Sequence, residues 1–376
     1  MTHEQRVLLH LSLINDVGPS TIHLLVAACA RLGVPLTYVV ECSIAQLCAL
    51  GLTMASAQTL KKGLEQAQLI EQELSLVERT GARIIFYTDA EYPDLLKHIA
   101  MPPLLLYVRG TLLSSCARTI AIVGSRQATA YGRECIAQIM PSVAAHGWCV
   151  VSGGARGIDT MAHEEALTCG VSTVVVLGSG LLVPYPRDNK QLFERVVTHG
   201  GAVMSSFGMT VDPEQWHFPA RNRIIAGMSL GVVVVQAAQK SGAHITARYA
   251  LDYGREVFAV PGKFNDALSA GCHELIHQGA TLLRSAEDLF EPFEPSVRPI
   301  SRKTVTEADT AQLAITQPLT VGERIMVCCR TGASIDELMS LLDLPAERVY
   351  EELFSLQMAG KVRQDFTGKF CSTSSA

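Results

Sequence analysis

The sequence lacks an excess of charge of either sign, and this absence excludes one class of protein. Its 376 residues carry 31 Lys and Arg against 36 Asp and Glu, for a formal net charge of −5. A chain with this balance cannot bind nucleic acid through a general cationic excess, so any such site must be a local concentration of positive charge. Since 48% of the residues are hydrophobic and only 18% are charged, the composition indicates a folded chain.

The sequence also has no long apolar run. Its least charged stretch, residues 166–186, is interrupted by polar residues, Gly and Pro, so it does not predict a membrane span of about 20 apolar residues. The N-terminus lacks the tripartite pattern of a signal peptide. The 11 cysteines form no C-x-x-C pair, and Cys135, Cys149 and Cys169 lie among aliphatic residues as small hydrophobic side chains do. We therefore expect a cytoplasmic protein.

From about residue 117 the sequence repeats a unit of a short β-branched run, a glycine turn and a helical pattern. The runs are residues 119–125, 148–154, 172–178, 201–206, 231–237 and 256–262. Strands that are apolar throughout and alternate with helices predict a parallel sheet covered on both faces. We therefore expect an α/β fold with a Rossmann-like, doubly wound and mostly parallel sheet, which binds its ligands at the carboxyl ends of the strands.

The flanking regions have different patterns, which predict a division into domains. We expect a helical module over residues 1–78, the α/β domain over residues 79–290, a linker over residues 291–318 and a small domain over residues 319–376. Residues 82–110 predict two short strands around a helix that lead into the main sheet. The small domain shows three helices followed by a hairpin, which predicts a winged helix.

The first of two glycine turns comprises Gly124, Ser125 and Arg126, between a predicted strand and a predicted helix. Glycine permits close backbone approach, and free amides at a helix amino end favour an anion. Arg126 adds a guanidinium that suits phosphate. An ordinary strand-to-helix turn with a solvated Arg explains the same tripeptide.

The second turn is SGGARGID, residues 152–159, in which Gly153, Gly154 and Arg156 precede a predicted helix. Consecutive exposed amides of this kind form a nest for phosphate oxygens. Asp159 fits a helix cap better than a catalytic acid. Neither turn carries G-x-G-x-x-G, and the chain has no G-x-x-x-x-G-K-[ST], so the sequence predicts no nicotinamide cofactor and no P-loop; we expect no cofactor.

A third cluster combines cations with an aromatic residue. Lys190 and Phe193 stand three residues apart on a predicted helix, so they share a face, and a cation beside a ring suits a phosphate followed by a stacked base. Phe193 fits the core of the domain equally well. Arg221, Asn222 and Arg223 come just before another predicted helix.

Residues 273–277 (HELIH) match H-E-x-x-H, in which two His one turn apart bind zinc. No compelling third ligand follows, and Leu275 and Ile276 give the segment an apolar face. This pattern favours a packing helix, so the sequence predicts no metal site.

The motifs taken in order resemble those of the DprA/Smf family of DNA-processing proteins. They are GSR, SGGARGID, YPRDN, FPARNRIIAG, SGAHITA, VFAVPG and GCHELIHQGA, which span residues 124–280. Residues 1–78 resemble the family's SAM-like extension, and Gly322 onward resembles its winged helix. The resemblance therefore covers nearly the whole chain.

The resemblance implies a protein that binds and protects incoming single-stranded DNA during natural transformation and loads the RecA recombinase onto it, without catalytic residues. The family's arginine falls on Arg126, and its lysine and aromatic residue fall on Lys190 and Phe193. The expected DNA contacts are Gly124, Ser125, Arg126, Gly153, Gly154, Arg156, Lys190, Phe193, Arg221, Asn222, Arg223 and Lys263. The family also implies a homodimer through the last α/β unit, which falls on Leu275, Ile276 and Leu282 here.

Two alternatives remain. Nucleotide phosphoribohydrolases share the fold and the glycine loops, but their P-G-G-x-G-T-x-x-E pattern places a Glu that residues 152–159 lack. A duplex-DNA regulator could act through the winged helix alone, but its predicted recognition helix, residues 345–358, carries more Glu than Arg. Both alternatives are therefore weaker than a binder of single-stranded DNA.

Overall fold

The computed structural model describes residues 1–112, 118–293, 321–329, 333, 335–342, 344–359, 361–364 and 370–372. The chain divides into two compact units, Met1–Glu294 and Pro295–Ala376. The predicted linker lies outside the described residues from residue 294 onward. In the parts of the chain that the structure describes, no helix has the length and apolar character needed to cross a membrane.

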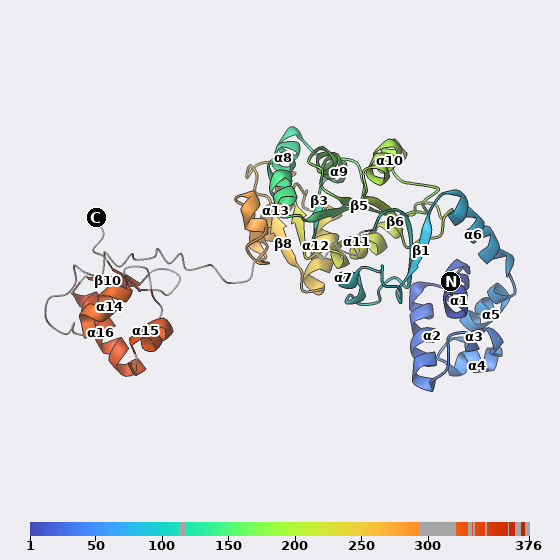
Figure 1. Cartoon of the computed structure of the whole chain (residues 1–376), viewed down its shortest axis with the longest axis horizontal. Coiled ribbons are helices and arrows are strands. Elements are labelled where there is room, and N and C mark those ends of the chain that lie inside the picture. Colours follow the sequence, from blue (N-terminus) through green and yellow to red (C-terminus); the bar gives the residue numbers. More distant parts are fainter. Residues whose placement is uncertain are drawn as a thin grey trace, which may run out of the picture. The chain divides into compact units, whose positions relative to one another are not determined.

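The first unit is built on a nine-stranded sheet in the order β1-β2-β6-β5-β4-β3-β7-β8-β9 (Figure 1). Its strands are β1 (Arg83–Phe86), β2 (Leu105–Gly110), β3 (Thr119–Val123), β4 (Cys149–Ser152), β5 (Thr173–Leu177), β6 (Ala202–Ser205), β7 (Gly231–Val234), β8 (Glu256–Ala259) and β9 (Thr281–Leu282). Strands β3 to β9 pair in parallel, whereas β2 is antiparallel to both β1 and β6. The Rossmann-like, mostly parallel sheet and its six predicted apolar strands are thereby confirmed.

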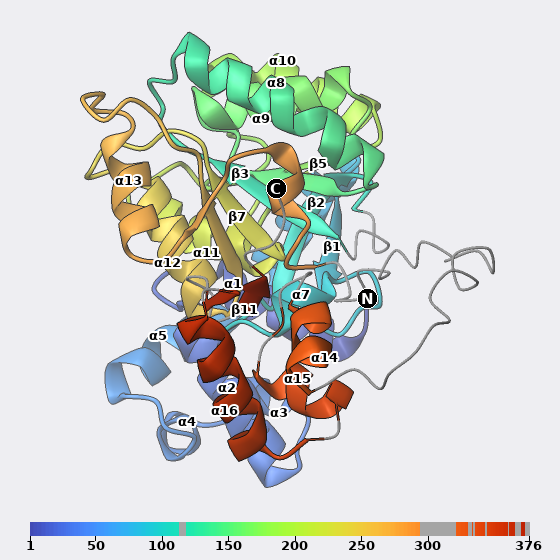
Figure 2. The same ribbon diagram turned by 90° about the vertical axis from the view of Figure 1, so that its left-hand side faces the viewer.

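Helices cover both faces of this sheet, as Figure 2 shows. On one face lie α8 (Ala130–Ala145), α9 (Ile158–Thr168) and α10 (Lys190–Thr198). On the other lie α7 (Asp94–Lys97), α11 (His217–Gly227), α12 (Ala243–Asp252) and α13 (Ala270–His277). Two-sided cover explains why apolar residues follow one another directly in the parallel strands, rather than alternating with polar ones.

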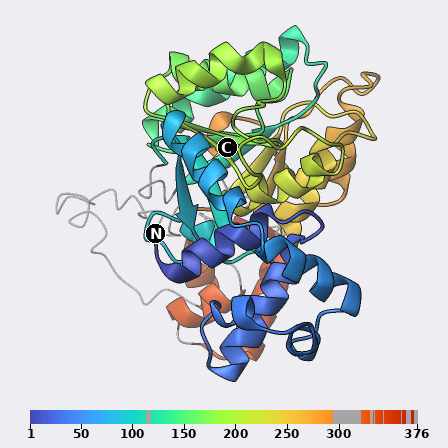
Figure 3. The same ribbon diagram turned by 90° about the vertical axis from the view of Figure 1, so that its right-hand side faces the viewer.

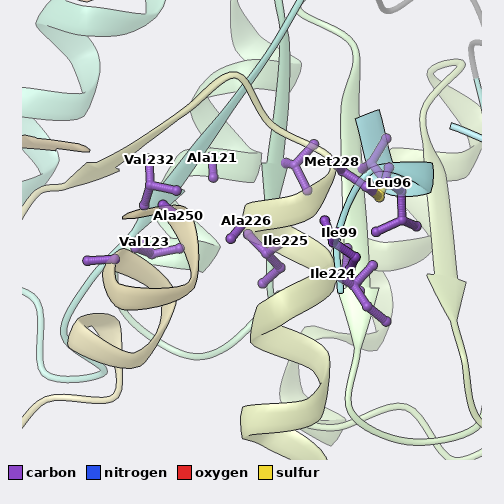
Figure 4. Packing of buried hydrophobic residues seen from close by; sticks show 14 of the residues in the cluster. Leu96, Ile99, Ala121, Val123, Ile224, Ile225, Ala226, Met228, Val232 and Ala250 are labelled. Carbon is purple, nitrogen blue, oxygen red and sulfur yellow. The ribbon is translucent and has the colours of Figure 1, made fainter. Parts of the chain in front are cut away.

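The alternation of strand side chains divides the core into layers. Ala121 and Val123 of β3 pack toward α11 and α12, together with Val232, Ile225 and Ala226 (Figure 4). The residues between them on the same strands pack against α8 and α9 on the opposite face. Successive strand residues point to opposite faces, so each short strand contributes to both layers.

The N-terminal residues form six helices. They are α1 (His3–Leu13), α2 (Pro19–Leu32), α3 (Tyr38–Glu41), α4 (Ile44–Ala49), α5 (Met54–Leu64) and α6 (Gln68–Arg79). Capping boxes at Thr2 and Ser43 begin α1 and α4. The helices enclose their own core, and α1 and α6 also pack against the sheet through Leu9 and Ile70 (blue in Figure 3). The helical module and the α/β domain therefore belong to one unit.

The second unit has a separate small core. Its described elements are α14 (Val321–Cys328), α15 (Ile335–Leu342), α16 (Ala346–Met358), β10 (Val362–Gln364) and β11 (Phe370–Ser372). Strands β10 and β11 pair in antiparallel fashion. Ile325, Leu338 and Leu353 are buried between the helices. Its assignment as a winged helix stays a prediction.

One cysteine differs from the prediction. Cys149 at the start of β4 is disulfide-bonded, so it is not the free hydrophobic residue that the sequence indicated. Cys135 and Cys169 are free and half-buried. A disulfide depends on the geometry of two residues brought together by the fold, so the spacing of cysteines along the chain could not reveal it.

Candidate nucleic-acid interface

A groove opens where the order of the sheet reverses. Strand β3 pairs with β4 on one side and with β7 on the other, and the chain moves away from β3 in both directions. Ligands of doubly wound sheets bind at this crevice, at the carboxyl ends of the strands. Two adjoining cavities of about 500 and 310 Å³ lie there, and we call them together the switch-point groove. Both cavities are lined by Arg126, Gln127, Ala155, Phe218 and Arg221.

The turn after β3 contributes the Arg126 side chain to the groove, and the Ser125 and Gln127 amides are bonded within the protein. The Ser125 amide donates to the Gln236 carbonyl at 2.7 Å, and the Gln127 amide donates to the Ser125 hydroxyl at 3.0 Å. The Arg126 side chain is exposed, and its Cζ lies 5.3 Å from the centre of the Phe218 ring. Of the predicted anion site at this turn, the structure therefore provides the Arg126 guanidinium.

The amide nest predicted after β4 already holds an anion of the protein itself. The buried Asp159 carboxylate accepts a hydrogen bond from the Ala155 amide at 3.3 Å and another from the Gly153 amide. Burial raises the pKa of Asp159, and the Arg221 charge and the two amides oppose this shift. The Gly153 and Ala155 amides therefore bind Asp159 in this structure, and phosphate binding at Gly154 and Arg156 stays a prediction. The predicted cap is corrected, because the N-cap of α9 is Gly157 rather than Asp159.

Arg221 is the internal counterion of this carboxylate. Its side chain is buried, with 4% exposed, and its Nη1 donates to the Val176 carbonyl at 2.9 Å. Burial lowers the pKa of Arg221 to about 10, an effect that Asp159 opposes, so the group stays charged at neutral pH. The prediction that Arg221 contacts phosphate directly is corrected, because its guanidinium lies within the wall of the groove.

The loop after β5 is tied to this wall. The Asn189 side-chain amide donates to the Gly154 carbonyl at 2.8 Å and to the Thr160 hydroxyl. Arg156 forms an ion pair with Asp188, with Nε and Oδ2 2.9 Å apart and both side chains 65% exposed. An exposed pair of this kind is weak because water screens both charges, so the phosphate of a ligand can replace Asp188.

Helix α10 exposes one of the two residues predicted to share a face and buries the other. Lys190 is exposed at the start of α10, and its charge, after the hydrogen bond from Arg109, helps to lower the pKa of Glu194. Phe193 is only 3% exposed and packs beneath Gly154, where an added Cβ would lie 2.7 Å from the ring. The predicted stacking of a base on Phe193 is wrong for this structure, because the core of the unit occupies both sides of the ring.

Two aromatic residues that the prediction missed take this place. Tyr185 is 40% exposed, its ring centre lies 5.6 Å from that of Phe218, and both line the smaller cavity with Arg126. An exposed ring and a half-buried ring beside a cation are the kind of stacking surface to which single-stranded nucleic acid binds. Both residues stand inside the motifs YPRDN and FPARNR, but nothing in the sequence indicates that their rings meet.

The comparison with known proteins agrees with this geometry. A family model described as DNA recombination-mediator protein A matches residues 83–294. The chain belongs to this family. The matched residues include the whole sheet and the switch-point groove.

Individual family members cover much of the chain. Protein Smf of Escherichia coli is 34% identical over 82% of this chain and 82% of its own length. DNA processing protein DprA of Bacillus subtilis is 42% identical over 62% of this chain and 80% of its own length.

Solved structures of the family have the same fold. DNA processing protein A of Streptococcus pneumoniae aligns with a TM-score of 0.66 and 32% identity, over 78% of this chain and 99% of its own. A structure of the Helicobacter pylori protein, described for its single-stranded DNA binding mode, aligns with a TM-score of 0.50 and 27% identity over 56% of this chain and 94% of its own.

The remaining candidates from the family motifs lie at different distances from the groove. Asn222 lines the larger cavity. Arg223 lines a separate cleft on the other side of α11, with Nη1 3.4 Å from the Ala100 carbonyl. Lys263 is exposed after β8 but lines neither cavity of the groove. Of these three residues, Asn222 is therefore the one that lines the groove.

The residues to which the family pattern assigns dimer contacts are divided between core and surface. Leu275 is 5% exposed within the core of its own unit, so its prediction as an interface residue is corrected. Ile276 is half-buried, and Leu282 is 40% exposed on β9 at the edge of the sheet. In the same segment, Nε2 of His273 lies 3.1 Å from the Gly262 carbonyl, so this histidine contacts the backbone after β8.

Proposed function

We propose that this chain binds and protects single-stranded DNA in the switch-point groove, and loads RecA onto it during natural transformation in the cytoplasm, without catalysis. The observation that carries the proposal is the meeting of Arg126 with the half-buried Phe218 ring, beside the exposed Tyr185 ring, in a chain of this family. Cations and stacking surfaces together suit a flexible polyanion with unpaired bases.

The backbone phosphates contact side chains rather than amides. Arg126 and Lys190 are exposed, and Arg156 becomes available when a phosphate displaces Asp188. A base stacks on the Tyr185 and Phe218 rings, which discriminate little among bases because every base has a π-face. Binding is therefore tolerant of sequence and weakens as salt rises, since each neutralised phosphate releases condensed counterions.

The absence of catalysis is inferred from the engagement of the groove's buried acid. The Asp159 carboxyl group accepts hydrogen bonds from two backbone amides and is influenced by the nearby charge of Arg221, so it is committed to the wall of the groove. Among the described residues that line the groove, no other acidic side chain could act on a glycosidic bond. Incubation with nucleoside monophosphates tests this inference: release of free base would favour a phosphoribohydrolase.

The homodimer and the RecA contact complete the proposal. Leu282 is exposed on β9 at the open edge of the sheet, and Ile276 of α13 is half-buried. This edge offers a surface to a second copy of the chain. Two copies joined there bring two grooves into one longer DNA track. RecA loading rests on membership of the DprA/Smf family, and we assign it no residues.

The double substitution Arg126→Ala with Lys190→Ala tests the site. We expect it to abolish nearly all binding to an oligothymidylate in a mobility-shift assay, while the far-ultraviolet circular dichroism stays unchanged. In the wild type, the logarithm of the binding constant should fall with the logarithm of salt concentration by about 0.7 per phosphate contacted. The exposed pair Lys62→Ala with Arg79→Ala, on α5 and α6, is the matched control. Unchanged affinity of the first variant rejects this groove as the site.

A further inference from the structure

Helix α11 lies between two cavities. Side chains spaced by three and four residues share a helix face. One such set, Phe218, Asn222 and Ile225, lines the switch-point groove. A second set, Trp216, Ala220 and Arg223, lines a separate cleft of about 720 Å³ between α11, the helical module and β2. We call it the module cleft. The two sets therefore lie on different faces of α11, and each begins at its amino end.

Trp216 is an unusual residue to find at the mouth of this cleft. It is the N-cap of α11, and its side chain is 62% exposed. The ring is held in place: its Nε1 donates to Glu214 at 2.5 Å, and the rings of His217 and Phe207 lie 4.0 and 6.3 Å away. A large ring that is fixed and yet open to solvent has its remaining surface available for a flat partner.

The charge of the module cleft suits a base better than a phosphate. Arg223 lines it together with the acids Asp16 and Glu214. His23 also lines it, and burial lowers the pKa of this histidine, which contacts the Pro102 carbonyl, so it is neutral at pH 7. With no net positive charge among these groups, we expect phosphates to remain at the rim of the module cleft.

We propose that a single DNA strand that leaves the switch-point groove crosses the amino end of α11 and stacks one base on Trp216 at the mouth of the module cleft. The inference rests on the proposed function and extends it, because the N-terminal helices would then form one wall of the DNA path. A short oligonucleotide that fills the groove does not reach Trp216, whereas a longer one does.

The chain's two tryptophans make this testable by fluorescence. Trp148 is 5% exposed and packs against the Phe290 and Phe293 rings, with centres 5.4 and 5.1 Å away, so its emission reports on the core. Quenching on addition of DNA therefore reports on Trp216. The probes are oligothymidylates of about 4 and about 16 nucleotides, which span the usual site sizes of single-strand binders.

We expect the longer oligonucleotide to quench the emission and the shorter one to leave it unchanged. Trp216→Ala should bind the longer probe about tenfold more weakly and the shorter probe as the wild type does, and Trp216→Phe should retain most of the affinity because it keeps a ring. Leu32→Ala, an exposed apolar residue on α2, is the control.

Two outcomes overturn the inference: emission that does not change when the longer probe saturates the protein, or equal affinity of Trp216→Ala and wild type for that probe. A wild type that binds neither probe contradicts the proposed function instead.

Discussion

At the residue scale, Gly153 shows that protein neighbours as well as ligands can demand a glycine. A Cβ added at this position would lie 1.6 Å from Nη1 of Arg221, inside the space that the guanidinium fills. The same residue donates its amide to Asp159. A glycine that looks like part of a phosphate nest therefore makes room for a buried guanidinium and donates its amide to a buried carboxyl group.

We expect Gly153→Ala to lower the free energy of unfolding by about 3 kcal/mol, because it overpacks the wall and displaces a buried charge from its partners. Urea unfolding measures the change. Gly242→Ala is the control, since that Cβ meets nothing within 4 Å. Equal stability of the two variants would contradict the packing argument.

His163 makes stability depend on pH. The residue is fully buried, and its Nδ1 lies 2.8 Å from the Thr173 hydroxyl, which donates to the Val150 carbonyl and so accepts from the ring. Nε2 has no partner among the described residues. Burial, and then the Arg221 charge, lower the pKa of His163 from 6.5 to about 3.

Between these values the unfolded chain binds a proton that the folded chain does not, so this contribution to stability is complete above about pH 6.5 and is lost as pH falls toward 3. The expected slope approaches 1.4 kcal/mol per pH unit. Urea unfolding at pH 7, 6 and 5 checks it against His163→Gln, whose stability should depend less on pH. Parallel curves would show that other groups are responsible.

At the element scale, β9 leaves one edge of the sheet open. It has two residues, pairs with β8 on one side, and exposes Leu282. An exposed edge offers backbone and apolar groups to another chain. The proposed dimer pairs through this edge, so we expect Leu282→Arg to be a monomer in light scattering, because two like charges would face each other across the symmetric contact. Leu32→Arg on α2 should leave the dimer intact, and a dimeric Leu282→Arg would move the interface elsewhere.

The parallel strands could be predicted because apolar residues follow one another directly in each of the six runs. This pattern is typical of a strand that is covered on both faces. The pairing of β2 with β6 could not be predicted, since it joins segments that are remote in the sequence. Local pattern determines the type of element, whereas the order of strands depends on the packing of the whole unit.

Arg126 could be predicted from the sequence, whereas the two rings could not. Arg126 follows a strand directly, so its place at the carboxyl ends of the strands follows from the sequence. The spacing of Lys190 and Phe193 indicates one side of a helix, but only the fold determines that Phe193 lies in the core. Tyr185 and Phe218 are 33 positions apart by their numbers, and only the fold brings their rings together.

At the scale of the whole molecule, the groove belongs entirely to the first unit. All its lining residues fall within Met1–Glu294. In the second unit, Arg348 of α16 pairs with Glu351 at 3.1 Å, so this cation is partly neutralised. We expect a chain of residues 1–294 to fold and to bind single-stranded DNA with the affinity of the full chain in a mobility-shift assay. A loss of more than about tenfold would assign the second unit a share of the DNA contact.

The carboxylate of Asp159 has a consequence for how a strand is captured. Because the Asp159 side chain accepts hydrogen bonds from the Gly153 and Ala155 amides, the loop keeps its shape in the empty protein. If DNA binds here as proposed, it enters a groove that is already formed, so binding requires little ordering of the protein. The association rate then depends on how often the two molecules collide in a suitable orientation.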